Sequence, residues 1–290
     1  MTMTQNNKRL ALFRTDPLEQ AHAIFAVSGT DIFALGHYPG NPIYPGVLVA
    51  ERLAALARVH AQTVLGQSAT AVSIRRIQYL DAIVAGDVVE LTASVKKHTR
   101  DEVELATVAR VGETVTTRAT VVCRAGPLPS CDGLLSLRES HQQGRSITHR
   151  DLPSVLPHRY PFLLLDTIDD YVVGKTLRAR KIVNRASPLF AGQQPASYPH
   201  GLVIESIGQA GIALYFLSRD DSRPVDIVLG SFGDAQFLAD VPFDSVLTVE
   251  ARIERQLENG VVLSGSARVG GQTVVSVGTL IAMIAPPPAG

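Results

Sequence analysis

The residues best suited to proton transfer are a histidine and two glutamates, each set in a distinctive context. His37 lies in the proline- and glycine-rich string GHYPGNPIYPG, residues 36–46, and Glu51 follows closely. Glu205 lies in LVIESIGQAGIALYFL, residues 202–217, which contains no other charged residue. Imidazole titrates closest to neutral pH and can accept a proton, whereas a carboxyl in apolar surroundings can be held protonated and donate one. The sequence therefore offers a general base and a general acid.

The two glutamates occupy equivalent places in an internal repeat. The repeated strings are Tyr44-Pro45 followed by Glu51, which returns as Tyr198-Pro199 followed by Glu205, and ARVG at 109–112, which returns at 267–270. Strings that recur at a nearly constant separation indicate a duplicated unit.

The stretch between the copies is polar, rich in turn-forming residues and without a clear period, so residues 127–150 are interpreted as a linker. We therefore expect two domains, residues 1–126 and 151–290.

Each copy shows the same order of secondary-structure signals. Apolar residues recur at helical spacing over 47–65, with Pro45 suited to the first turn of a helix. Strict alternation predicts strands over 88–95, 103–111 and 247–253. One long helix against a run of antiparallel strands, made twice, predicts an α+β fold with each helix laid across a curved sheet.

The segment from Gly36 to Glu51 resembles, almost position for position, the signature of 3-hydroxyacyl-[acyl-carrier-protein] dehydratases with the hotdog fold. In the second half, LPHRYPFLLLD, residues 156–166, looks like the opening segment of the same enzymes. The resemblance implies two hotdog domains in tandem that pair as a pseudo-dimer. It also implies dehydration of a 3-hydroxyacyl thioester on an acyl carrier protein to the trans-2-enoyl thioester, in fatty-acid, polyketide or polyene biosynthesis.

In that family the histidine comes from one subunit and the acidic residue from the other. Carried over, the resemblance implies one working site built from His37 as base and Glu205 as acid. The second site would pair Gln193 with Glu51, and because glutamine cannot act as a general base we expect that site to have decayed. Glu51 is then interpreted as a relic that orders its helix or binds a backbone amide.

Four more residues are candidates for substrate contact. The backbone N–H of Gly46, at the start of a helix, could stabilise charge on a thioester oxygen. Gln209 resembles a family glutamine that orients the acid, or is a buried amide satisfied across the helix pair. His200 begins the helix of the acid and either contacts substrate or caps that helix, and Tyr38 belongs to the signature loop. His158 is interpreted as structural or at the tunnel mouth.

Composition restricts the partners. Lys and Arg total 27, as do Asp and Glu, so the formal net charge is zero, which argues against a nucleic-acid binder. Acyl carrier proteins are acidic, so a docking patch should be basic. The candidate clusters are Arg75-Arg76, Lys96-Lys97 and the group Arg178, Arg180 and Lys181. The resemblance implies no metal and no organic cofactor.

The chain is expected to be cytoplasmic and without a membrane span. Its first ten residues show no apolar segment of a secretory signal, and residues 201–217 are shorter than a bilayer needs and are interpreted as a buried helix. Cys123 and Cys131 form no metal-binding pattern and are expected to stay reduced.

Three alternatives remain open. A hotdog thioesterase would use an acidic residue to activate water, and a non-catalytic partner subunit would explain Gln193; neither needs the intact signature around His37. For Glu205 the alternative is an ion pair with Arg178 or Arg180. Acyl chain length, pathway and the joining of two chains through exposed sheet edges are left open as well.

Overall fold

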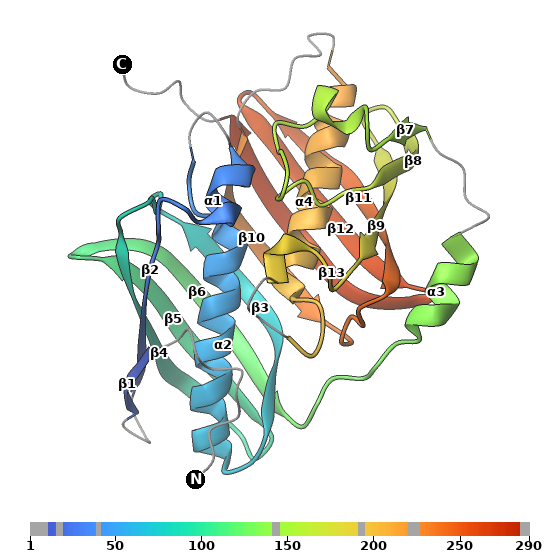
Figure 1. Ribbon diagram of the computed structural model, residues 1–290. Coiled ribbons are helices and arrows are strands. Elements are labelled where there is room, and N and C mark those ends of the chain that lie inside the picture. Colours follow the sequence, from blue (N-terminus) through green and yellow to red (C-terminus); the bar gives the residue numbers. More distant parts are fainter. Residues whose placement is uncertain are drawn as a thin grey trace.

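The computed structural model describes residues 11–15, 20–38, 42–140, 146–190, 195–219 and 227–284. Within these ranges the chain forms one antiparallel sheet, and two long helices lie across the same side of it (Figure 1). The strands of the first half are β1 (Ala11–Thr15), β2 (Gln20–Ala26), β3 (Ala69–Tyr79), β4 (Val88–His98), β5 (Glu102–Val111) and β6 (Thr114–Ala125).

The strands of the second half are β7 (Ile147–Thr148), β8 (Thr167–Val172), β9 (Thr176–Val183), β10 (Ile227–Phe237), β11 (Ser245–Leu257), β12 (Gly260–Val269) and β13 (Gln272–Ile284). The helices are α1 (Ile32–His37), α2 (Gly46–Leu65), α3 (Gly133–Ser140) and α4 (His200–Leu217), with 3-10 turns at Leu152–Ser154 and Pro188–Phe190.

The strand order is mirrored about the centre of the sheet. The order is β1-β2-β4-β5-β6-β3-β10-β13-β12-β11-β9-β8-β7. β3 and β10 pair antiparallel, with Ile77 opposite Phe232 and Ile74 opposite Ala235. Outward from that pair, β6-β5-β4-β2-β1 on one side matches β13-β12-β11-β9-β8 on the other. Each half packs one long helix on its strands, which confirms the predicted α+β hotdog architecture.

The two long helices begin and end where the sequence predicts. Pro45 and Pro199 precede α2 and α4 with φ of −61° and −60°, values that proline fixes in advance. α2 ends at Gly66, which adopts a φ of +65° that glycine reaches without strain. α4 is the one described helix long and apolar enough to cross a membrane, yet most of it is buried inside the fold, as expected of a core helix.

The amino-terminal turns of α2 and α4 touch. A Cβ added to Gly201 would lie 2.7 Å from the carbonyl oxygen of Val47, so only glycine permits this approach. The backbone N–H of Gly201 donates a 2.8 Å hydrogen bond to Oε2 of Glu51. Glu51 thus binds a backbone amide of the opposite helix, one of the two roles expected for it, and joins the halves.

The stretch interpreted as a linker is partly helical. α3 lies in it and packs at the rim of the second half (Figure 1). Ser136 is buried, and its Oγ accepts a 2.9 Å hydrogen bond from the N–H of Val246 in β11. No strong apolar period marks this helix in the sequence, because its stability comes from contact with the second half.

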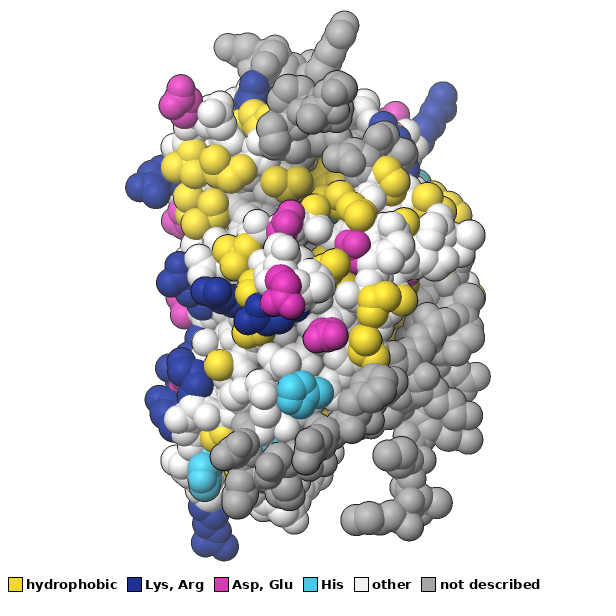
Figure 2. Space-filling model, turned by 90° about the vertical axis from the view of Figure 1, so that its left-hand side faces the viewer, with side chains coloured by type: hydrophobic (Ala, Val, Ile, Leu, Met, Phe, Trp, Pro, Cys, Tyr) yellow, Lys and Arg dark blue, Asp and Glu magenta, His cyan; other side chains and the backbone are white. Residues whose placement is uncertain are grey.

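Basic side chains gather along one margin of the face at the left of Figure 1, which Figure 2 turns toward the viewer. In the first half, Arg75, Lys96 and Lys97 surround Glu104, with N–O distances of 3.3, 3.1 and 3.3 Å. Three cations therefore share one carboxylate, and this cluster keeps a positive charge.

Two of the three cations in the basic group of the second half are paired with carboxylates. Arg180 contacts Asp169 at 2.7 Å and Lys181 contacts Asp166 at 3.0 Å. Both cations are thus largely neutralised, which weakens this group as a docking patch.

The packing of β12 under α4 can be tested at one glycine. A Cβ at Gly265 would lie 2.5 Å from Cγ2 of Ile207 and 2.6 Å from the carbonyl oxygen of Glu250. We expect Gly265→Ala to lower the free energy of unfolding by about 1–3 kcal/mol, the usual cost of overpacking. At Gly271 a Cβ would meet nothing within 4 Å, so Gly271→Ala should change the free energy of unfolding by less than about 0.5 kcal/mol. Denaturant unfolding measures both, and equal losses would contradict this packing.

Candidate active site

His37 is placed by a short helix that the sequence did not predict. It is the last residue of α1, whose first turn is capped by Asp31 Oδ1 accepting hydrogen bonds from the N–H groups of Phe33 and Ala34. A Cβ on Gly36 would lie 2.8 Å from the Pro161 ring, so glycine lets α1 approach the second half closely. The histidine therefore enters a site to which the other half contributes.

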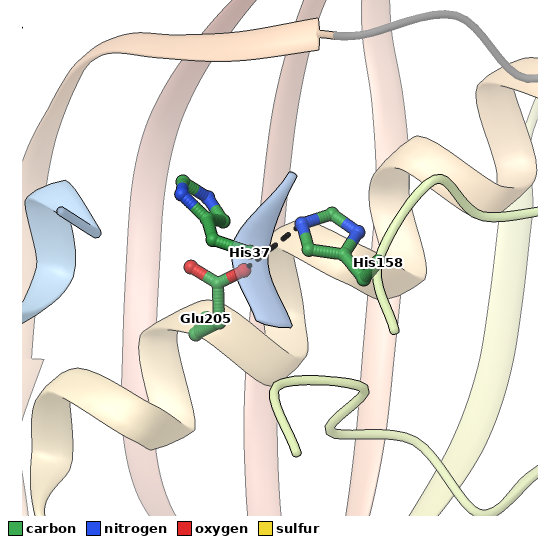
Figure 3. A group of neighbouring side chains, drawn as sticks. All are labelled: His37, His158 and Glu205. Carbon is green, nitrogen blue, oxygen red and sulfur yellow. Dashed lines mark ion pairs between the residues drawn. The ribbon is translucent and has the colours of Figure 1, made fainter. Parts of the chain in front are cut away.

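The carboxylate of Glu205 contacts two side chains of the second half. Its Oε1 accepts a 3.0 Å hydrogen bond from Nε2 of Gln209 and lies 3.4 Å from Nε2 of His158. In Figure 3 its second oxygen lies toward His37. Arg180 pairs with Asp169 instead, so the arginine pairing considered for Glu205 through that residue is not present.

Gln209 holds the acid in place through a fully used amide. Its Nε2 donates to Glu205 and also to the carbonyl oxygen of Phe162, at 2.9 Å, while its Oε1 accepts from the N–H of Leu164 at 2.8 Å. Gln209 is thus a satisfied buried amide that contacts the carboxylate of Glu205, but its other partners lie in the segment before β8 and not across the helix pair.

His158 is the site residue that sequence reasoning undervalued. Its side chain is 1% exposed, so the expectation of a place at the tunnel mouth is wrong. Its ring lies 5.6 Å from that of His37 and 5.3 Å from that of Tyr38, centroid to centroid. The available signal was a titratable residue inside PHRYP, a segment that already resembled the dehydratases.

Burial controls the protonation of His37. Burial, with a smaller contribution from the neighbouring His158, lowers the pKa of His37 to about 4, against the opposing effects of Glu205 and the Ile43 carbonyl. His37 is therefore uncharged at neutral pH and can accept a proton.

The pKa of Glu205 reflects opposing influences. Burial raises it, whereas the hydrogen bonds from His158 and Gln209 and the charge of either protonated histidine lower it below the ordinary value. Because His37 is uncharged at neutral pH, its share of that lowering is absent there.

Two cavities meet at this trio. The larger, of about 420 Å³, is lined by His37 and Glu205 together with Gly46, Tyr79 and Ile83 of the first half and Leu229 of the second. The smaller, of about 20 Å³, is lined by the trio, Tyr38 and apolar residues of α4 and the neighbouring strands. The reactive groups therefore face a pocket large enough for an organic substrate on one side and a nearly filled space on the other.

The remaining candidate residues from the sequence do not all line the cavities. Gly46 lines the larger pocket. The hydroxyl of Tyr38 donates to the carbonyl oxygen of Ile227, so this residue ties α1 to β10. His200 stacks on Phe237, and its Nε2 lies 3.0 Å from the carbonyl oxygen of Ala239, outside the lining of either cavity. Gln193 lies outside the described residues.

The trio also has the residue types of a metal site. The ligand atoms of His37, His158 and Glu205 lie within 4.8 Å of one another, and two imidazoles with a carboxylate suit ions such as Zn²⁺. The same residue types are also suited to acid–base chemistry, which needs no ion.

Comparison with known proteins places the chain among dehydratases. A family model described as ApeI-like dehydratase matches residues 14–117. The 3-hydroxyacyl-[acyl-carrier-protein] dehydratase FabZ of Enterococcus faecalis is 32% identical over 130 residues, which are 44% of this chain and 92% of the relative. FabZ of Dechloromonas aromatica is 36% identical over 125 residues, 42% of this chain and 87% of the relative.

Solved structures resemble the whole chain rather than half of it. The PpsC dehydratase domain of Mycobacterium tuberculosis aligns with a TM-score of 0.66 and 13% identity, covering 98% of this chain and 100% of that one. A dehydratase domain of a mycocerosic acid synthase-like polyketide synthase gives a TM-score of 0.66 and 15% identity, covering 98% of each chain. The fold is thus that of hotdog dehydratase domains. By its similarity to FabZ, the chain belongs to the 3-hydroxyacyl-[acyl-carrier-protein] dehydratase family.

The protonation of His37 can be measured without substrate. Nitrogen-15 NMR of the imidazole rings should show His37 neutral down to about pH 4, because its burial disfavours the charged form. The variant His37→Asn assigns the signal by its disappearance. A midpoint near 6.5, the value of a free imidazole, would contradict the buried site.

Proposed function

We propose that this chain dehydrates 3-hydroxyacyl groups carried on an acyl carrier protein at one composite site, with His37 as base and Glu205 as acid. Membership of the dehydratase family establishes the reaction, and what we propose is the role of each of these two residues in it. The observation that carries it is that His37 of the first half and Glu205 of the second line the same pocket.

The base acts through Nε2. Nδ1 of His37 lies 3.3 Å from the carbonyl oxygen of Ile43, and donation to that oxygen leaves the Nε2 lone pair for the substrate. Nε2 takes a proton from C2, next to the thioester carbonyl. The charge that develops on the carbonyl oxygen is stabilised by the N–H of Gly46 at the start of α2.

Glu205 completes the elimination. It gives a proton to the 3-hydroxyl, the C3–O bond breaks, and water leaves as the double bond forms between C2 and C3. An acyl chain in the pocket displaces water, and this added desolvation favours the protonated carboxyl that the step requires. Transfer of the proton from His37 back to Glu205 restores the starting state.

The two halves are proposed to be tandem hotdog domains, residues 1–126 and 151–290, that form a pseudo-dimer with one working site. The mirrored strand order supports this, as does the match of the whole chain to complete dehydratase domains. Glu51 occupies the repeat position of Glu205 but binds the backbone of Gly201, and no histidine stands at Gln193.

The carrier protein is proposed to dock on the first half. Arg75, Lys96 and Lys97 share the single carboxylate of Glu104 and so keep an excess of positive charge for an acidic partner. A cytoplasmic location, in fatty-acid or polyketide biosynthesis, agrees with the two free cysteines.

The reaction and its residues are tested together by intact mass. A carrier protein bearing a short 3-hydroxyacyl group should lose one water with the wild-type chain. His37→Ala and Glu205→Gln should each slow this loss by at least about 100-fold, since each removes a proton-transfer group. Glu51→Gln, the matched change in the other half, should keep activity within about threefold.

Each other outcome of that experiment has a definite meaning. Loss of the whole acyl group would identify a thioesterase. An inactive Glu51→Gln variant that folds normally would contradict a single site.

The role of His158 is tested by His158→Phe, which keeps an aromatic ring beside Glu205 and removes its N–H donor. We expect kcat to fall about 10- to 100-fold and the alkaline limb of its pH profile to shift, because Glu205 loses a hydrogen-bond donor that lowers its pKa. Without that donor the carboxyl should stay protonated to higher pH, so the limb should move upward. An unchanged profile with normal stability would remove His158 from the site.

A further inference from the structure

Tyr79, the last residue of β3, is one of the residues that line the larger pocket. The phenol oxygen is inaccessible to solvent and has no hydrogen-bond partner among the described residues. Tyr79 lines the cavity that His37, Gly46 and Glu205 also line. Phenylalanine would supply the same ring, whereas tyrosine here bears the free-energy cost of burying a hydroxyl without a hydrogen-bond partner.

The ring of Tyr79 lies directly against the start of α2. A Cβ built on Gly46 would lie 2.8 Å from both Cε1 and Cζ of Tyr79. Cζ carries the hydroxyl, so that group lies beside the first turn of α2, where backbone N–H groups have no partner within the helix. Two kinds of donor, a phenol and the helix N–H groups, therefore border the same part of the pocket.

We propose that the Tyr79 hydroxyl is a second hydrogen-bond donor to the thioester carbonyl oxygen, acting with the N–H of Gly46. The inference rests on the proposed function, because the carbonyl is that of the 3-hydroxyacyl thioester. Tyr79 is then a catalytic residue that stabilises the developing oxyanion and transfers no proton. The hydroxyl that is unpaired without substrate gains its partner when the acyl group enters.

The electrostatic setting keeps Tyr79 a donor. Burial, and then the charge of Glu205, raise the pKa of the phenol well above its usual value. The hydroxyl therefore stays protonated throughout the range in which the enzyme works. A donor in a pocket largely closed to water stabilises developing negative charge more strongly than the same donor in solvent.

Tyr198 provides a matched control. Its hydroxyl is also buried and without a partner among the described residues, and its ring packs against Phe190 and Phe243. It lines neither of the two cavities at the trio. Tyr198→Phe thus makes the same chemical change, loss of one buried phenol oxygen, away from the pocket.

The first test compares kinetics of Tyr79→Phe, Tyr198→Phe and the wild-type chain on the loaded carrier protein. We expect Tyr79→Phe to lower kcat about 10- to 100-fold with KM changed by less than about threefold, as for removal of one oxyanion donor. Tyr198→Phe should keep kcat within about twofold. Thermal unfolding of all three checks that both variants keep the fold.

The second test reads the hydrogen bond directly. A carrier protein is loaded with a butyryl thioester, labelled with carbon-13 at the carbonyl, which lacks the 3-hydroxyl and cannot be dehydrated. Binding to the wild-type chain should lower the carbonyl stretching frequency, and Tyr79→Phe should abolish part of that shift while Tyr198→Phe preserves it.

The outcomes separate this inference from the proposed function. If the wild-type chain removes water and Tyr79→Phe keeps kcat within about twofold, the inference is overturned and the function stands. A fall in kcat with an unchanged carbonyl frequency also overturns it, because the hydroxyl would then act elsewhere. A wild-type chain that dehydrates no loaded carrier overturns the proposed function itself.

Discussion

The contact between the amino-terminal turns of α2 and α4 is the constraint on which the site depends. Gly201 allows backbone approach to Val47, and Glu51 fixes the contact with a hydrogen bond across the two halves. The pairing of β3 with β10 holds the same junction from the sheet side. Because His37 and Glu205 come from opposite halves, any slip at this junction would separate the proposed base from the proposed acid.

Burial influences the protonation of three groups that line the larger pocket, His37, Glu205 and Tyr79. The same exclusion of water keeps His37 neutral, raises the cost of ionising Glu205 and leaves the phenol of Tyr79 protonated. Hydrogen bonds from Gln209 and His158 then decide where the carboxylate points. The apolar surroundings of Glu205 on α4 thus raise the cost of ionising it, which opposes the lowering of its pKa by the hydrogen bonds from His158 and Gln209.

The glutamate at one position of the repeat makes different contacts in the two copies. Glu51 and Glu205 are equivalent in the repeat, yet Glu51 is bound to the backbone N–H of Gly201, whereas Glu205 lies with His37 and His158. Glu51 therefore joins the two halves, while Glu205 remains available for the proposed proton transfer.

The sequence alone predicted the α+β plan and the helices behind Pro45 and Pro199, because strings and periodicities record local preferences. It also singled out His37 and Glu205, which the structure brings to one pocket. It could not place His158, Tyr79 or His200. Whether a side chain faces a pocket depends on how distant strands and helices pack, which no local period encodes. His158 reaches Glu205 and Tyr79 reaches Gly46 only through tertiary contacts, while His200 turns toward Phe237. Tertiary structure therefore decided which titratable groups share a buried space.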